Sequence, residues 1–233
     1  MAPSTEPRAG RRLSIVIPAL NEAPQICATL ADLQPLRSQG HQLILVDGGS
    51  QDGTPDLAKP LVDQLLTAPP GRARQMNAGA ALAAGDVLWF LHGDTRIPPG
   101  APRALLAALD RGAAWGRFDV RLSGSHPLLR IVERLMNLLS CVQGIATGDQ
   151  GIFLGRALFQ QLGGYPDQPL MEDIALSRAL RRRGRPACVR ERLVTSSRRW
   201  ERRGILRTIW LMWHLRLAYA LGADPAWLAE RYR

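Results

Sequence analysis

Short apolar runs separated by amphipathic stretches dominate the first half of the chain. The runs cover residues 13–17, 43–46 and 87–91, with a shorter one at Leu65 and Leu66. Runs of this length, bounded by Gly, Pro or Asp, are typical of strands buried on both faces, as in parallel sheets covered by helices. Helical patterns begin near residues 22, 54 and 72. This alternation predicts an α/β domain with a doubly wound, mostly parallel sheet.

The run at residues 87–91 is followed by His92, Gly93 and Asp94. In open α/β sheets ligands bind beyond the carboxyl ends of the strands, which places these residues over the expected crevice. A carboxylate there, beside a Gly that lets a ligand approach the backbone, is suited to hold a divalent cation that bridges two phosphates. The alternative is that Asp94 only forms the turn before Pro98, since Asp is a common turn residue.

The first two strands are also followed by polar residues that should reach the same edge of the sheet. These candidates are Pro18, Asn21 and Glu22 after the first strand and Asp47 and Gly48 after the second. Asp47 can accept a hydrogen bond from a base or a ribose hydroxyl, and Arg72 and Arg74 can reach phosphate. The sequence has neither the G-x-G-x-x-G dinucleotide motif nor the P-loop motif, so a nucleotide would be held in another way.

The second half of the chain has less regular patterns. Helices are predicted over residues 101–109, 127–142 and 174–183, and a half-exposed strand over residues 116–122. The helix at residues 127–142 is apolar on more than one face, which indicates burial in the core, with a covering membrane or partner as the alternative. Glu172 and Asp173 open the last of these helices, where two acids are ordinary complements of the helix dipole.

Residues 204–221 form an apolar stretch whose length barely reaches that of a membrane span. Arg207 and Arg216 lie within it, and each Arg near a bilayer centre costs about 2.5 to 3.5 kcal/mol, so spanning is unfavourable. The apolar side of the helical wheel is formed by Ile205, Ile209, Met212, Trp213 and Tyr219, and the narrow polar face by Arg203, Arg207 and His214. We expect an amphipathic helical extension over residues 201–233. It either packs against the main domain or a second subunit, or lies in a membrane interface beside anionic lipid.

The charge of the chain narrows the choice of partners. The net charge is +10, and Lys59 is the only Lys among 30 basic residues, which favours phosphate-bearing or anionic partners. Thirteen Arg lie between Arg178 and Arg216, yet this region has no recognised nucleic-acid motif. We therefore expect no nucleic-acid partner.

Two further features bear on the cellular compartment. Cys27, Cys141 and Cys188 are widely separated, odd in number and outside metal-binding spacings, which indicates reduced thiols in the cytoplasm. Residues 1–12 lack the apolar core of a signal peptide, so we expect a disordered leader there.

Taken together, these motifs resemble those of the family 2 glycosyltransferases, which have the GT-A fold. The matching segments are residues 14–18 with 21–22, residues 46–54, 77–80, 92–94 and 172–173. Their order and spacing cover about residues 13–185. Residues 115–118, 148–150 and 198–200 extend the resemblance to a small bacterial subgroup, some of whose members are named for arsenosugar biosynthesis.

The resemblance implies a hexosyltransferase-type enzyme that uses a nucleotide-sugar donor, expected to be a UDP-sugar, together with Mg²⁺ or Mn²⁺. The donor-side residues would be Pro18, Asn21, Glu22, Asp47, Gly48, Arg72, Arg74, His92 and Gly93. Asp94 would bind the metal, which neutralises charge on the leaving diphosphate. Asp173 would be the base that deprotonates the acceptor hydroxyl, with Glu172 as the fallback.

The sequence departs from the family pattern at two points. One is His92, which stands where the D-x-D motif of the family has its first Asp; it could contact ribose or phosphate, or be a structural hydrogen-bonded His. The other is described below, among the candidates for the acceptor side.

The candidates on the acceptor or diphosphate side are Gly148, Asp149, Gln150, Arg199 and Trp200. The last two are similar to the Arg-Trp pair of processive synthases, but Ser196 replaces their Gln, so we expect transfer of a single sugar.

These expectations combine into one function and two alternatives. A GT-A domain over residues 13–200 would transfer one sugar, with inversion, to a hydroxyl of a small or lipid-linked acceptor. The enzyme would be cytoplasmic, with contact to the inner face of the membrane left open, as is its oligomeric state. One alternative is a nucleotidyltransferase that makes nucleotide sugars, but residues 18–23 lack the Gly-rich basic loop of that class. The other is a non-catalytic basic module that binds membrane or nucleic acid.

Overall fold

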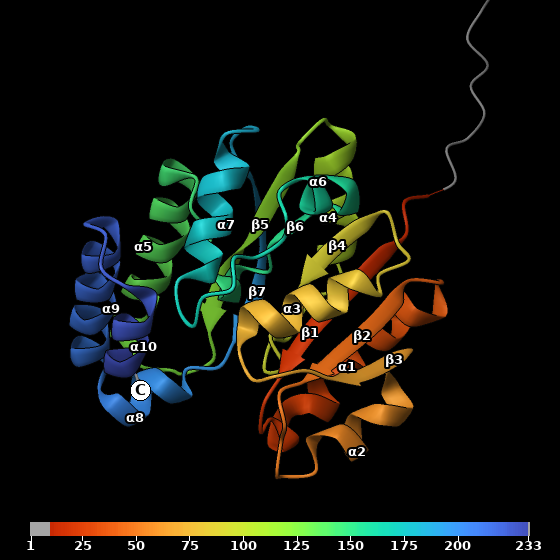
Figure 1. Ribbon diagram of the computed structural model, residues 1–233, viewed down its shortest axis with the longest axis horizontal. Helices are drawn as coiled ribbons and strands as arrows, with labels where there is room; N and C mark the ends of the chain where they lie inside the picture. The colour runs from red at the N-terminus through yellow and green to blue at the C-terminus, as the bar shows by residue number, and fades with distance from the viewer. Residues whose placement is uncertain (1–9, 233) are drawn as a thin grey trace, which may run out of the picture.

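The computed structural model describes residues 10–232, and its central element is a seven-stranded sheet (Figure 1). The strands follow the order β3-β2-β1-β4-β6-β5-β7 across the sheet. Their bounds are β1 (Leu13–Ala19), β2 (Gln42–Asp47), β3 (Gln64–Thr67), β4 (Val87–Phe90), β5 (Trp115–Leu122), β6 (Phe153–Gly155) and β7 (Ala187–Thr195). Most of the predicted leader, residues 1–9, lies outside the described residues.

The sheet is mostly parallel, which confirms the predicted α/β class. β1 pairs in parallel with β2 and with β4, and β2 pairs in parallel with β3. β6 runs antiparallel to both of its neighbours, β4 and β5. β7 pairs in parallel with β5 and was not predicted, because the charged residues 190–192 in its middle interrupt the apolar pattern.

The predicted helices agree with the structure to within a few residues, whereas the helices at residues 156–161 and 198–203 were not predicted. The helices are α1 (Ala23–Ser38), α2 (Thr54–Ala58), α3 (Arg72–Ala81), α4 (Ala101–Asp110), α5 (Pro127–Gln143), α6 (Arg156–Gln161), α7 (Glu172–Arg181), α8 (Arg198–Arg203), α9 (Ile205–Ala220) and α10 (Pro225–Tyr232). Short 3-10 turns lie at η1 (Lys59–Leu61) and η2 (Gly148–Gln150).

Helices cover both faces of the sheet. On one face, Ile15 and Ile17 of β1 pack with Leu30 of α1, in a cluster that also includes residues of α4. On the other face, Val16 of β1 packs with Met76 of α3, in a cluster that extends to α6 and α7. Because successive strand residues point to opposite faces, burial on both faces explains why the apolar runs are unbroken.

A layer of helices lies beside the end of the sheet that β5 and β7 form, where α5, α7, α9 and α10 gather at the left of Figure 1. Ile174 of α7 packs with Leu215 of α9 and Leu228 of α10. Leu129 of α5 packs against Leu122 of β5. With α5 over it, β5 is mostly buried, so the prediction of a half-exposed strand is wrong.

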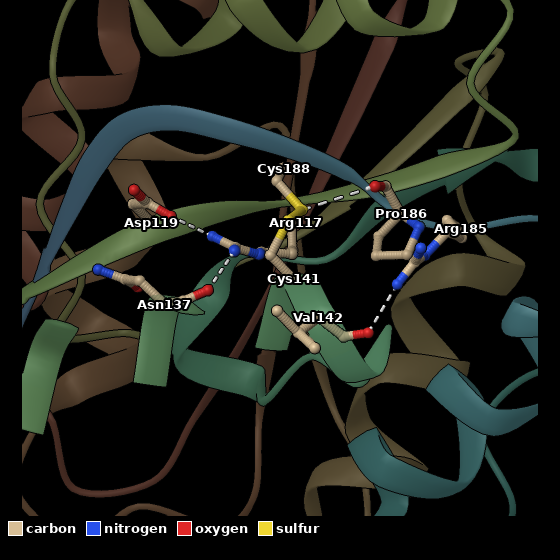
Figure 2. Close-up of a disulfide and its surroundings, with 8 residues drawn as sticks. All are labelled: Arg117, Asp119, Asn137, Cys141, Val142, Arg185, Pro186 and Cys188. Atoms are coloured by element: carbon tan, nitrogen blue, oxygen red, sulfur yellow. Dashed lines mark hydrogen bonds and ion pairs between the residues drawn. A yellow bond between two sulfur atoms is a disulfide. The ribbon is translucent and has the colours of Figure 1, made fainter. Parts of the chain in front are cut away.

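The expectation of reduced thiols is wrong for two of the three cysteines. Cys141 of α5 and Cys188 of β7 form a disulfide, with their Cα atoms 5.9 Å apart (Figure 2). A Cα separation of this size is within the range that a disulfide bridges. The sequence pattern did not indicate the pairing, because the two cysteines are 47 residues apart in the chain. Cys27 is free and exposed. The thiols therefore give no support to a reducing compartment.

Candidate active site

The carboxyl ends of β1, β2 and β4 lie next to one another, because these strands are neighbours in the sheet. Gln75 of α3 joins two of these ends by donating hydrogen bonds to the carbonyls of Ala19 and Val46, both at 2.8 Å. A Cβ at Gly48 would lie only 3.0 Å from the Gln75 amide nitrogen, so a larger residue there would press on this bridge. Pro18, whose Cα partner is Val46, is the penultimate residue of β1. The predicted meeting of these loops at one edge is thus present in the structure.

Asp47, at the end of β2, is almost completely buried. Its carboxylate accepts hydrogen bonds from the backbone N–H groups of Gly49 at 2.8 Å and Ser50 at 3.0 Å, and from the Ser50 hydroxyl at 2.5 Å. Asn21 closes the same loop, because its Oδ1 accepts from the Gln51 N–H at 2.9 Å. Each carboxylate oxygen has two lone pairs, so Asp47 keeps capacity for a ligand while it shapes the loop.

Glu22 and Asp94 share a cationic neighbour from the far end of the chain. Arg198 of α8 donates to Glu22 Oε2 at 2.8 Å and lies 3.5 Å from Asp94 Oδ2. Burial raises the pKa of Glu22, and the charge of Arg198 offsets this only in part. Gly93 lies against Glu22, where a Cβ would approach the Glu22 side chain to 3.3 Å. Arg198 was not a predicted site residue, although it lies in the segment 198–200 that carries part of the family resemblance.

His92 faces the loop that precedes β6. Its Nδ1 lies 3.1 Å from Asp149 Oδ1, and its Nε2 is buried with no hydrogen-bond partner among the described residues. Gly148 packs against the imidazole so closely that a Cβ there would lie 2.6 Å from Nε2. Burial acts to raise the pKa of Asp149, but the hydrogen bond to His92 and the charges of Arg72 and Arg199 lower it overall.

Two acids at the start of α7 complete this region. Asp173 accepts hydrogen bonds from the backbone N–H groups of Gly148 at 2.8 Å and Ile174 at 2.7 Å. Burial raises the pKa of Asp173 although both amides oppose this. Burial and the nearby charge of Asp173 raise the pKa of Glu172 to about 7. One buried acid that accepts two amide hydrogen bonds, beside another that stays protonated to near neutral pH, is an arrangement suited to proton transfer.

Arg72, at the first position of α3, has an exposed side chain and lies near four carboxylates, which are called here the carboxylate cluster: Asp94, Asp149, Glu172 and Asp173. Desolvation acts to lower the pKa of Arg72, but the charges of these four carboxylates raise it overall. Arg74, two residues further along α3 and on another side of the helix, instead pairs with the exposed Asp167 at 2.8 Å. Of the two predicted phosphate contacts, only Arg72 therefore lies among the other candidates.

The remaining candidates divide between the site and the core. The Arg199 guanidinium lies over the Tyr232 ring of α10, 4.2 Å from its centroid. Burial lowers the pKa of Arg199, and the charge of Arg72 adds to this effect. Trp200 instead packs with apolar residues of α5 and α9. Gln150 is buried, and its side-chain oxygen accepts from the Thr147 N–H at 3.1 Å, which holds the turn η2 in shape.

The side chains of this site could hold a divalent cation only together with the phosphates of a bound ligand. Within residues 10–232 no group of three or more His, Cys, Asp or Glu side chains is arranged to hold a metal ion. Mg²⁺, however, is commonly bound through one or two carboxylates, with substrate phosphates and water as the other ligands. Asp94, at the end of the central strand and near Arg72, offers such a carboxylate.

The sequence relatives of the chain are glycosyltransferases. A probable glycosyltransferase of Bacillus subtilis, YdaM, is 27% identical over 195 residues, which is 71% of this chain and 46% of that protein. An undecaprenyl-phosphate 4-deoxy-4-formamido-L-arabinose transferase of Aeromonas hydrophila is 33% identical over 109 residues, 42% of this chain and 33% of that one. The chain thus spans less than half the length of both of these relatives.

Solved structures share the fold at low sequence identity. A mannosyltransferase from Pyrobaculum calidifontis, in complex with GDP-mannose and Mn²⁺, matches with a TM-score of 0.66 and 19% identity over 97% of this chain and 70% of that one. Glucosyl-3-phosphoglycerate synthase from Mycobacterium tuberculosis, with Mn²⁺ and UDP, matches with a TM-score of 0.59 and 23% identity over 81% and 72%. These likenesses confirm the predicted GT-A fold. The Glycosyl transferase family 2 model matches residues 14–153, which is more than half of the chain, and the protein belongs to that family.

Proposed function

We propose that the protein transfers a single sugar from a nucleotide-sugar donor, a UDP-sugar, to a hydroxyl group of a small or lipid-linked acceptor. The observation that carries this proposal is the placement of Arg72 among four carboxylates, at the edge of the sheet where β1, β2 and β4 end. An anionic diphosphate can pair with Arg72 there, and a divalent cation can pair with the carboxylates. Membership of the family supports a donor of this class.

The residues at the ends of β1 and β2 would hold the nucleoside. Asp47 would accept a hydrogen bond from the base or ribose with the one lone pair of Oδ1 that its loop leaves free, and Pro18, Asn21, Glu22 and Gly48 would shape the pocket around it. Arg72 would bind the diphosphate. Asp94 would hold Mg²⁺ or Mn²⁺, which supplies positive charge next to the leaving diphosphate.

Asp173 would take the proton in the transfer step. The acceptor oxygen forms a bond to the anomeric carbon as its proton passes to Asp173, and the bond from that carbon to the diphosphate oxygen breaks. The electron pair of the broken bond leaves with the nucleoside diphosphate. Attack from the face opposite the leaving group inverts the anomeric carbon, so no covalent intermediate with the protein forms. The Gly148 amide, which donates to Asp173, would keep the carboxylate aimed at the acceptor.

The name of one relative and three sequence segments bear on the class of acceptor. The name of the Aeromonas relative specifies a lipid phosphate, which supports testing lipid-linked hydroxyls or phosphates beside small acceptors. Residues 115–118, 148–150 and 198–200 support placement in the small bacterial subgroup named above. We further infer a cytoplasmic enzyme that meets its acceptor at the inner face of the membrane.

A donor-hydrolysis screen tests the proposed function. UDP-, GDP- and dTDP-sugars are incubated with the protein in Mg²⁺, in Mn²⁺ and in a chelator, and the released nucleoside diphosphate is measured. We expect metal-dependent release from a UDP-sugar and none with the chelator. Release of pyrophosphate from a nucleoside triphosphate and a sugar 1-phosphate, with no donor hydrolysis, would instead identify a nucleotidyltransferase.

A further inference from the structure

The helices α5 and α9 each leave a line of large apolar side chains uncovered. On α5 the line consists of Ile131, Leu135, Leu138 and Val142, and on α9 it consists of Leu206, Trp210, Trp213 and Leu217, continued by Leu221. Each of these side chains is between 47% and 80% exposed. The spacing of four, three and four residues places each line along one side of its helix. We call the two lines together the α5–α9 face.

Burial on α5 and α9 differs from what the sequence predicted. The expected burial of α5 is correct for Leu129 and Val132 and wrong for this outer line. On α9, Ile205 and Ile209 of the expected apolar side pack against the α5 cluster, whereas Trp213 of that side is exposed and belongs to the outer line. The cause is that α9 uses two of its sides for packing, one against α5 and one against α7 and α10.

The two lines lie on neighbouring helices that run in the same direction. α5 follows the carboxyl end of β5, and α9 follows the carboxyl end of β7 through α8; these strands are parallel, with Leu122 opposite Thr195. Both helices therefore start at one edge of the sheet and lie side by side (Figure 1). Ile205 and Ile209 of α9 pack against the cluster that contains Leu129 and Val132 of α5, and on both helices the exposed line lies on another side. Two adjacent helices thus each present an apolar line that the described part of the chain leaves uncovered.

The charged side chains that α5 and α9 themselves expose are of one sign. Arg134 of α5 and Arg207 of α9 are exposed beside the two lines. The only acid in either helix, Glu133, is buried and accepts a hydrogen bond from the Leu122 N–H. Two helices that expose apolar lines and Arg side chains but no carboxylate of their own are complementary to a layer of anionic headgroups over hydrocarbon. Trp210 and Trp213 fit such a boundary, because Trp is enriched where membrane meets water.

A second copy of the chain is a poorer occupant for the same face. In a symmetric pair, each subunit would present the same surface to the other. Arg134 and Arg207 would then approach their counterparts with no exposed carboxylate on either helix to pair with them, and like charges in an interface are unfavourable. Crossing the membrane is also excluded for these helices, since none in the described part of the chain is long and apolar enough to span it.

We propose that the α5–α9 face docks the protein onto the surface of an anionic membrane, with both helices parallel to the bilayer plane. Docking in this way would also bring Arg198 and Arg199 near the headgroups, because α8 leads directly into α9. The open edge of the candidate active site would then face lipid-linked molecules. The docking itself does not depend on the proposed transfer reaction.

Vesicle flotation tests the docking without any sugar donor. The purified protein is mixed at low salt with vesicles of phosphatidylcholine alone or of phosphatidylcholine with phosphatidylglycerol. We expect flotation with the anionic vesicles, reduced by added salt because screening weakens attraction to the surface. Trp210→Ser/Trp213→Ser should abolish flotation, whereas the control Leu57→Ser/Leu82→Ser, at exposed leucines away from this face, should float as the wild type does.

A double variant that removes two arginines provides the second part of the vesicle-binding test. Arg134→Gln/Arg207→Gln should weaken binding to anionic vesicles about 30-fold, since each Arg near such a surface contributes about 1 kcal/mol. The control Arg103→Gln/Arg111→Gln, on and just after α4, should bind normally. The proposal is overturned if the wild type does not float, if it floats equally with neutral vesicles, or if the Trp variant floats unchanged. It is equally overturned if the wild type forms a dimer that the Trp variant abolishes, because the face is then a subunit interface.

Discussion

The Asp173 carboxylate accepts a hydrogen bond from the Gly148 amide at 2.8 Å, which connects the start of α7 to the turn η2 before β6. These two segments are distant in sequence, and each carries a candidate for the acceptor side of the site. Their connection means that a change at Asp173 alters both the proposed base and the position of the loop. Experiments at Asp173 therefore have to separate proton transfer from loop placement.

We expect Asp173→Asn to lower turnover by about 10² or more while nucleotide affinity changes little, because the amide keeps the shape but cannot take a proton. Steady-state kinetics and calorimetry with UDP measure the two effects. Gly148→Ala serves as the comparison for loop placement, since its Cβ would press on His92 without removing the carboxylate. Near-normal turnover in Asp173→Asn would show that another group is the base.

Asp94→Ala should weaken the binding of UDP in Mn²⁺ by tenfold or more, in line with loss of a charge-assisted contact worth about 1.5–3 kcal/mol. In a chelator the variant and the wild type should bind UDP alike. His92→Ala should cost less than Asp94→Ala, because an imidazole supplies no negative charge to the cation. Titration calorimetry with and without metal decides the matter. Equal affinity for UDP and Mn²⁺ in a folded Asp94→Ala protein would remove Asp94 from the metal site.

Arg72 and Arg74 provide a matched pair two residues apart. Arg72→Ala should lower affinity for UDP about tenfold or more, because Arg72 lies among the carboxylates where the diphosphate is proposed to bind. Arg74→Ala should change affinity less than about twofold, since its partner Asp167 is exposed and such pairs contribute about 0–1 kcal/mol. Calorimetry on both variants checks the prediction. A larger effect at Arg74 would place the diphosphate on the other side of α3.

The raised pKa of Glu172 predicts a pH dependence of stability. Burial and the charge of Asp173 raise this pKa from 4.5 to about 7, so the folded protein holds the proton more tightly than the unfolded chain does. The free energy of unfolding should therefore fall as the pH rises from about 4.5 to about 7, by up to about 3 kcal/mol from this group. Glu172→Gln should remove that fall. Urea unfolding of both proteins across this range is the measurement, and parallel pH curves would contradict the assignment.

The disulfide predicts a difference between oxidised and reduced protein. Closing a loop of 47 residues restricts the unfolded chain, so reduction should lower the free energy of unfolding by about 2–4 kcal/mol. Urea unfolding with and without a reductant measures this. Cys141→Ser/Cys188→Ser should match the reduced wild type and not respond to the reductant. Cys27→Ser is the control and should behave as the wild type, because that thiol is free.

The strand ends could be predicted from the sequence because parallel topology fixes where they lie. Apolar runs located β1, β2 and β4, and residues after consecutive parallel strands necessarily emerge at one edge. The placement of Asp47, His92 and Asp94 beyond those ends followed from that rule alone. Glu172 and Asp173 could be linked to the same region only through the family resemblance.

Other features depend on contacts that no local pattern encodes. Arg198 meets Glu22 across 176 residues of sequence, and Cys141 meets Cys188 only after α5 packs beside β7. The separation of Arg72 from Arg74 depends on the rotation of α3 against the sheet. Hydrophobic pattern also could not tell which sides of α5 and α9 would be covered, because both helices are apolar on more than one side.

The reversed direction of β6 has a consequence for how this site can change. Val87 lies opposite Gly155 and Trp89 opposite Phe153, so the chain enters β6 at the edge where β4 leaves the sheet. Asp149 comes to lie against His92 for this reason. The loop after β4 thus leaves the sheet at the same place where the loop before β6 enters it. We call them the departing loop and the arriving loop. The arriving loop can gain or lose residues between α5 and η2, ahead of the contacts that Gly148 and Asp149 make with His92, without altering the departing loop. Acceptor preference could therefore diverge in evolution while the nucleotide end stays constant.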